Sequence, residues 1–121
     1  GWDHTVWRQE FPSRRDLDTI APNNPVYLVR VDGHVAWANS AALKAAGITR
    51  DTPDPAGGEI ERDAQGEPTG ILKETAQGLV GRLVPPPTAE QNQKAMEAAL
   101  EMARRYGITS IQDNSGYETT K

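Results

Sequence analysis

The pattern of hydrophobic and polar positions predicts a β-hairpin in the first third of the chain. Residues 26–31 are dense in β-branched and aromatic side chains, and residues 34–38 repeat this character after Asp32-Gly33. Asp-Gly is typical of a two-residue type I′ turn, because both central positions of that turn need positive φ. The two segments are therefore expected to pair as antiparallel strands.

Short helices are expected on both sides of this hairpin. A capping-box pattern at Ser13 and Asp16 predicts one helix directly after it. A second helix is predicted over residues 40–46, capped by Asn39 or Ser40, whose side chains can accept a hydrogen bond from the first turn.

The middle of the chain predicts a loop, a second pair of strands and a helix. Residues 51–58 are rich in Pro and Gly and cannot continue a regular element. A short strand over residues 59–63 and a return segment at residues 69–72 follow. An approximate apolar stripe then predicts a helix over residues 73–83.

The clearest helical pattern covers residues 89–106. Thr88 and Gln91 form a second capping box, and apolar residues recur at steps of three and four on a polar background. The stripe consists of Ala95, Met96, Ala99, Leu100, Ala103 and Tyr106.

The last residues indicate a change of structural unit. Gly107 ends the helix, and residues 108–113 are expected to form a strand, which is how a βαβ unit ends. A stiff triple proline begins at Pro85. The sequence therefore predicts an α+β domain over residues 1–84, with a small sheet, a hairpin and short helices, and a separate unit over residues 85–121.

Composition and charge exclude several classes of protein. At 121 residues the chain is too short for a complete (β/α)₈ barrel, which needs about 250. A net charge of −4 argues against nucleic-acid binding, and the lack of Cys excludes disulfides and thiolate zinc sites. No apolar run approaches the roughly 20 residues of a membrane span. The chain begins at Gly1 rather than Met, which predicts that it is a piece of a longer protein.

Spacing alone nominates no complete catalytic or metal centre. His4 and His34 are the only histidines, and neither has the spacing of a metal motif or of a serine-nucleophile pair. Of the two histidines, His34 is the stronger candidate for a functional residue, because it follows the hairpin Asp-Gly, where a neutral imidazole can contact a polar ligand. A surface histidine without a role is the alternative. Helix capping accounts for Asn39, and core packing accounts for Trp37.

Several stretches together carry a resemblance to one family. They are Gly1-Trp2-Asp3 with Trp7, residues 15–18, residues 30–34, residues 39–43, residues 46–55, Gly57-Gly58, residues 66–72 with Glu74, and residues 106–110. In this order, over essentially the whole chain, they resemble an amidohydrolase of the family 3 type, the group similar to N-substituted formamide deformylases.

The resemblance implies a longer parent enzyme with a metal-dependent hydrolase barrel and a small β-sandwich. That parent would hydrolyse a C–N bond of a small amide-type substrate with metal-activated water. Residues 1–84 would be an α+β insertion that forms a lid at the barrel mouth. Residues 85–121 would supply a linker, the first barrel helix and the second barrel strand.

The family's metal ligands, including a His-x-His pair, are missing from this chain. A divalent metal ion, expected to be zinc, is therefore assigned to the parent, and no cofactor or metal ligand to this chain. It follows that the isolated chain is predicted to be catalytically inactive and to contain no catalytic residue.

The resemblance also implies candidate substrate-binding residues in the intact parent. These are His34 and Asn39 in the Asp-Gly-His…Asn-Ser stretch, Glu74 in the Gly-x-Leu-x-Glu stretch, and Asp3 and Trp7 in the opening motif.

The residues themselves leave one alternative function open and predict one partner. The alternative is a freestanding α+β module that binds a small ligand or a protein without catalysis. A barrel helix without its barrel needs another cover for its apolar stripe, so the C-terminal third is expected either to form a homodimer, which is favoured, or to fold back onto the sheet of the first domain. Nucleic-acid and membrane partners are not expected.

Overall fold

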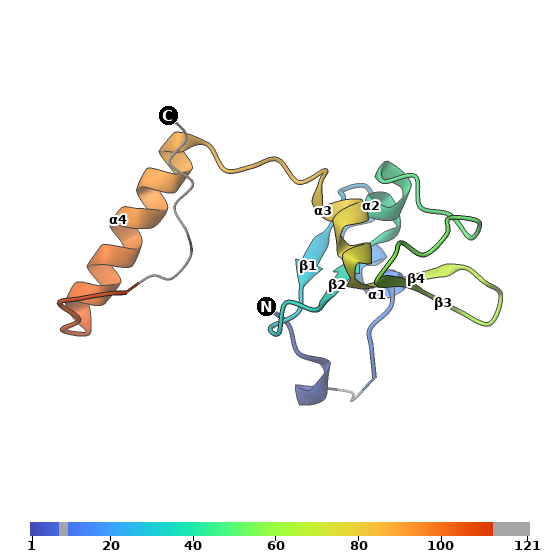
Figure 1. Cartoon of the computed structure of the whole chain (residues 1–121), viewed down its shortest axis with the longest axis horizontal. Helices are drawn as coiled ribbons and strands as arrows, with labels where there is room; N and C mark the ends of the chain where they lie inside the picture. Colours follow the sequence, from blue (N-terminus) through green and yellow to red (C-terminus); the bar gives the residue numbers. More distant parts are fainter. Residues whose placement is uncertain (8–9, 113–121) are drawn as a thin grey trace. The chain divides into compact units, whose positions relative to one another are not determined.

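Four antiparallel strands form one sheet within residues 1–85, in the order β1-β2-β4-β3 (Figure 1). The computed structural model describes residues 1–7 and 10–112. Its strands are β1 (Tyr27–Val29), β2 (Val35–Ala38), β3 (Gly58–Arg62) and β4 (Pro68–Glu74). The prediction of a small α+β fold with a hairpin is confirmed.

Short helices accompany this sheet. They are the 3-10 helices η1 (His4–Val6) and η2 (Thr75–Gln77), and the α-helices α1 (Arg14–Asp18), α2 (Ser40–Ala45) and α3 (Gly78–Gly81). The predicted caps are confirmed: the Asp16 carboxylate accepts from the Ser13 N–H at 2.8 Å, and Asn39 Oδ1 accepts from the Ala42 N–H at 2.9 Å. Among the described residues, no helix has the length and apolar character needed to cross a membrane.

The first hairpin has a longer loop than the predicted type I′ turn. The loop is closed by a hydrogen bond from the Arg30 N–H to the Val35 carbonyl at 2.8 Å. Gly33 has a φ of 79°, but Asp32 does not have a positive φ. The side chain of Asp32 explains the difference, because it pairs with Arg30 and its Oδ1 accepts from the His34 N–H at 3.1 Å. The type I′ prediction was therefore wrong, although the strands pair as expected.

The helix predicted over residues 73–83 is only partly present. Lys73 and Glu74 belong to β4, and helical structure is confined to η2 and α3. Ile71 and Leu72, which contributed to the apparent helical stripe, are fully buried strand residues. The misreading has a physical cause: β4 is a central strand, paired with both β2 and β3, so both of its faces are apolar.

The two faces of the sheet bury two separate apolar clusters. One contains Ala36, Ala38, Ile60 and Leu72 of the strands with Leu43 of α2 and Val80 of α3. The other contains Val35, Trp37 and Ile71 with Leu17 of α1 and Trp2. Consecutive residues of the central strands alternate between the clusters, as the pleat requires. The sheet is thus the middle layer of residues 1–85, with helices on both faces.

Residues 86–121 form a second unit, built on α4 (Ala89–Arg105). The capping box at Thr88 and Gln91 is confirmed, with the Thr88 N–H donating to Gln91 Oε1 at 2.8 Å and the Gln91 N–H donating to Thr88 Oγ1 at 3.2 Å. The strand predicted over residues 108–113 is not formed at residues 108–112, and Asp113 lies outside the described residues. A barrel strand is stabilised by hydrogen bonds to paired strands. Among the described residues no strand pairs with this segment, and the Ile108 N–H donates to the Ala103 carbonyl at the end of α4 at 2.9 Å.

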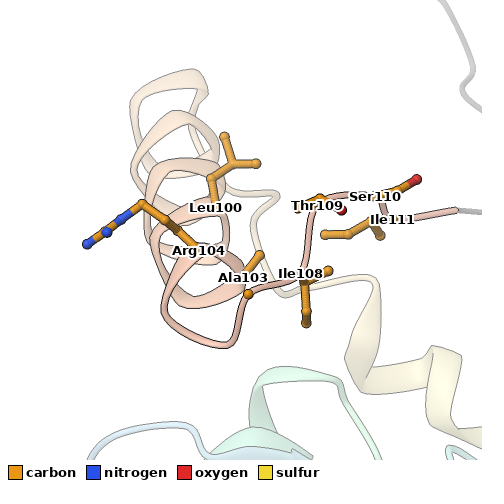
Figure 2. A pocket seen from close by; sticks show the side chains of 8 residues that line it. Leu100, Ala103, Arg104, Ile108, Thr109, Ser110 and Ile111 are labelled. Carbon is orange, nitrogen blue, oxygen red and sulfur yellow. The ribbon is translucent and has the colours of Figure 1, made fainter.

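Two residues of the apolar stripe of α4, Leu100 and Ala103, line a shallow hollow. Figure 2 shows Leu100 and Ala103 of the helix with Ile108 and Ile111 of the segment that follows it. The hollow that these residues line has a volume of about 330 Å³. Leu100 remains 57% exposed, and Ile111 remains 68% exposed. This unit therefore holds little apolar core of its own.

Candidate functional site

The sheet brings together two of the sequence-predicted site residues, His34 and Glu74. His34 ends the hairpin loop before β2, and Glu74 ends β4, which pairs with β2 so that Val35 lies opposite Lys73. Nδ1 of His34 lies 3.0 Å from Oε2 of Glu74, and the Glu74 N–H donates to the His34 carbonyl at 2.9 Å. Residues forty positions apart therefore form one exposed imidazole–carboxylate pair.

The pair is electrostatically coupled. The hydrogen bond with Glu74, followed by the charge of that carboxylate, raises the pKa of His34 above 6.5, and Asp32 adds to the rise. Both side chains are open to solvent, at 67% and 57% exposure. An imidazole of this kind can accept or donate a proton near neutral pH, which is the chemistry of a binding or proton-transfer group.

His34, Glu74 and the residues that contact them form one corner of the sheet. A third predicted residue, Asp3, is linked to this corner by a chain of charged groups. The Arg30 guanidinium lies 3.5 Å from Asp3 Oδ1 and also pairs with Asp32, whose other oxygen accepts from the His34 backbone. Two hydrogen bonds from Thr5 lower the pKa of Asp3. The network thus extends from the N-terminal segment to Glu74.

Three members of this corner were missed by the sequence reasoning: Arg30, Asp32 and Gln77. Gln77 Nε2 donates to the Gly33 carbonyl at 3.0 Å and so ties η2 to the hairpin loop. Arg30 and Asp32 lie within four residues of His34, and this group of charged residues around the predicted turn was a usable signal. Nothing in the sequence indicated Gln77.

Trp7 lies apart from the imidazole–carboxylate pair, in an aromatic cluster. Its ring is parallel to that of Trp2 at 6.1 Å between centroids and meets Trp37 edge-on at 6.2 Å. With Pro12 and Asp16, Trp7 and Trp37 line a cavity of about 230 Å³. Half of the Trp7 side chain stays exposed, so this cluster joins the core of one sheet face to the surface.

Asn39 is fully buried and its amide serves the fold. Its oxygen accepts two backbone hydrogen bonds and its nitrogen donates two, all at 2.8–2.9 Å. The structure does not bring this side chain to the corner formed by His34 and Glu74.

No complete metal centre occurs in the described part of the chain. Within residues 1–7 and 10–112, no three His, Asp or Glu side chains converge in a way that could hold a metal ion. The arrangement can therefore offer hydrogen bonds, charge and a titrating imidazole to a ligand, but its residues do not fit a whole metal site.

Comparison with known proteins places this geometry in a family. The family model described as "Amidohydrolase family" matches residues 1–121. The chain belongs to the amidohydrolase family.

The chain is also similar to individual proteins. Protein LONG AFTER FAR-RED 3 of Arabidopsis thaliana is 43% identical over 117 residues, which cover 97% of this chain and 20% of that protein. The N-substituted formamide deformylase of Arthrobacter pascens is 53% identical over 75 residues, 62% of this chain and 14% of that enzyme.

A solved structure extends the likeness to the fold. The crystal structure of an uncharacterized metal-dependent hydrolase from Pyrococcus horikoshii OT3 matches with a TM-score of 0.57 and 28% identity. The match covers 91% of this chain and 20% of that hydrolase. The chain thus spans a fifth or less of the length of each of these three proteins.

Proposed function

We propose that this chain is a segment of a metal-dependent amidohydrolase that hydrolyses C–N bonds of small amide-type substrates. The family match over all 121 residues supports the class, and the 53% identity to an N-substituted formamide deformylase supports the type of bond. Residues 1–84 act as the insertion that covers the mouth of the parent's barrel. Residues 85–121 supply its linker, first helix and second strand.

The observation that carries the proposal is the pairing of His34 with Glu74 at 3.0 Å. Both residues come from stretches typical of the family, and the sheet places them together at an exposed edge. In the parent these side chains contact the substrate and help to exclude water from it. The metal ion would be held by the parent's remaining residues and would activate the attacking water.

The isolated chain is expected to have no hydrolase activity. Metal-assisted hydrolysis needs an ion with an open coordination position, and this segment lacks the ligands that the family uses. An amidase assay of the chain with added zinc checks this expectation. Turnover above that of a boiled sample would refute it.

The full-length protein tests the positive part of the proposal. It should hydrolyse an N-substituted formamide, and the His34→Ala variant should lose kcat/KM by about tenfold or more, because a positioned side chain at the substrate is removed. The exposed residue Gln93 on α4 provides the control. Gln93→Ala should leave kcat/KM unchanged. If His34→Ala also retained the wild-type kcat/KM, His34 would have only a structural role.

We further propose that the isolated chain self-associates through its second unit. Met96 and Leu100 of α4 and its C-cap residue Tyr106 are more than half exposed, and association would remove this apolar surface from water. Sedimentation velocity should show a concentration-dependent dimer that Leu100→Glu abolishes. A monomer at all concentrations would contradict the proposal.

A further inference from the structure

The backbone of Glu74 has a conformation that L-amino acids rarely adopt. Its φ is 50° and its ψ is −124°, close to the first central position of a type II′ turn, where glycine is preferred. At every other described position with positive φ the chain carries glycine. A side chain at this one position therefore carries a cost in stability that glycine would remove.

Neighbouring segments hold Glu74 in this conformation from two sides. On one side its N–H donates to the His34 carbonyl at 2.9 Å. On the other side the Thr75 hydroxyl donates to the Ala56 carbonyl at 2.9 Å, and Gly58 packs so closely that an added Cβ would lie 2.4 Å from the Ala76 nitrogen. The strained geometry is built into the sheet rather than being a feature of a loose loop.

Within the described residues, the carboxylate of Glu74 makes one contact, the hydrogen bond to His34 Nδ1. A carboxylate that is ionised can only accept, so Nδ1 carries the proton and Nε2 is the nitrogen left for a ligand. No hydrogen bond among the described residues uses Nε2. Exposed ion pairs add little to stability, so this contact does not offset the backbone strain.

We propose that Glu74 is a positioning residue, whose carboxylate orients the His34 imidazole so that Nε2 binds a polar group of the amide-type substrate. Strain retained for a side chain with no large structural role is typical of functional sites. A carboxylate behind an imidazole fixes its tautomer and its direction, which is the same arrangement used wherever a histidine must present one nitrogen to a reacting group. The substrate in this inference rests on the proposed function, whereas the pairing and the strain are properties of this chain.

Two measurements on the chain test the pairing and the strain without any catalysis. In an NMR titration, His34 should titrate above the ordinary histidine value, and Glu74→Gln should lower its midpoint. In thermal unfolding, Glu74→Gly should melt about 4 °C or more above Glu74→Ala, because both lack the carboxylate and only glycine relieves the φ. An unmoved His34 midpoint, or equal melting of the two variants, would overturn the inference.

The full-length enzyme tests the role toward substrate, with N-butylformamide as the probe. Glu74→Gln should lower kcat/KM by about tenfold or more. The same variant should move the histidine limb of the pH profile to lower pH, a change that a merely structural residue would not cause. Glu67→Gln, which changes a partly exposed glutamate of the β3–β4 turn, should leave both unchanged.

The remaining outcomes separate this inference from the proposed function. Loss of bound metal in Glu74→Gln, measured by elemental analysis, would overturn the positioning role, because the carboxylate would then be a metal ligand. Failure of the wild-type full-length protein to hydrolyse the formamide would count against the proposed function and the substrate contact. In that case the titration and the melting comparison still decide whether Glu74 is strained and coupled to His34.

Discussion

Asn39 and Val26 are joined by a hydrogen bond of 2.9 Å from the Val26 N–H to the Asn39 Oδ1. The same oxygen accepts from the Ala42 N–H and so caps α2, while the amide nitrogen donates to the carbonyls of Ala21 and Asn24 at 2.8 Å each. One buried side chain therefore connects the turn before β1 with the start of a helix.

Replacement of Asn39 by Ala should lower the free energy of unfolding by about 3 kcal/mol. Loss of the Asn39 amide removes a helix cap and leaves the Val26 N–H and two carbonyls without their partner. Urea denaturation measures the change. Asn92→Ala, an exposed asparagine on α4, should stay within about 0.5 kcal/mol of wild type. An unchanged midpoint for Asn39→Ala would show that water replaces the lost bonds.

Two glycines should respond in opposite ways to the same substitution. Gly58→Ala should destabilise the fold by about 2 kcal/mol or more, because the new Cβ would lie 2.4 Å from the Ala76 nitrogen and 2.9 Å from the Lys73 carbonyl oxygen. Gly78→Ala should be neutral or stabilising by up to about 1 kcal/mol, because nothing lies within 4 Å of its Cβ and its φ is helical. Equal melting temperatures for the two variants would contradict the packing seen around β3.

The His34–Glu74 pair should stabilise the chain only toward lower pH. The pKa of folded His34 is raised by its hydrogen bond to Glu74 and by the charges of Glu74 and Asp32. Below pH 6.5 the imidazole is protonated in both states and the pair contributes in full. Its contribution is lost as the pH rises through the folded pKa. The stability difference between wild type and Glu74→Gln, measured at about pH 6 and about pH 9, should therefore shrink at the higher pH. A difference that grows with pH would reverse the sign of the coupling.

The capping box of α4 should be needed for the helicity of the second unit. Thr88→Ala removes the acceptor for the Gln91 N–H and should lower helix stability by about 1 kcal/mol. Circular dichroism at 222 nm follows the loss during thermal unfolding. Thr88→Ser retains the hydroxyl and should behave like wild type, so a parallel loss in both variants would argue against the cap.

Local signals in the sequence predicted much of the fold correctly. The two capping boxes, the Asn39 cap and the β-branched run at residues 26–31 each act over a few neighbouring residues, and each was found where expected. The errors arose where distant contacts decide. Ile71 and Leu72 fitted a helical stripe, but pairing with β2 and β3 makes them strand residues.

The candidate site shows the same division. Family-like stretches indicated His34 and Glu74 separately, and neither spacing nor composition showed that the two side chains touch. Their contact depends on the register of β2 against β4, which is set by long-range strand pairing. The positive φ of Glu74 is equally a product of the surrounding segments, since no local preference would place a glutamate there.

The sequence by itself determined the secondary structure that short-range capping, turn and periodicity rules control, the absence of thiol chemistry, and the family to which the chain belongs. Only the tertiary structure decided which strands lie in the centre of the sheet and where the hairpin loop at Asp32 closes. It also decided that His34 pairs with Glu74, whose backbone is strained. The physical reason is that capping and periodicity act between residues close in sequence, whereas strand register and side-chain pairing arise from contacts between distant segments that form together.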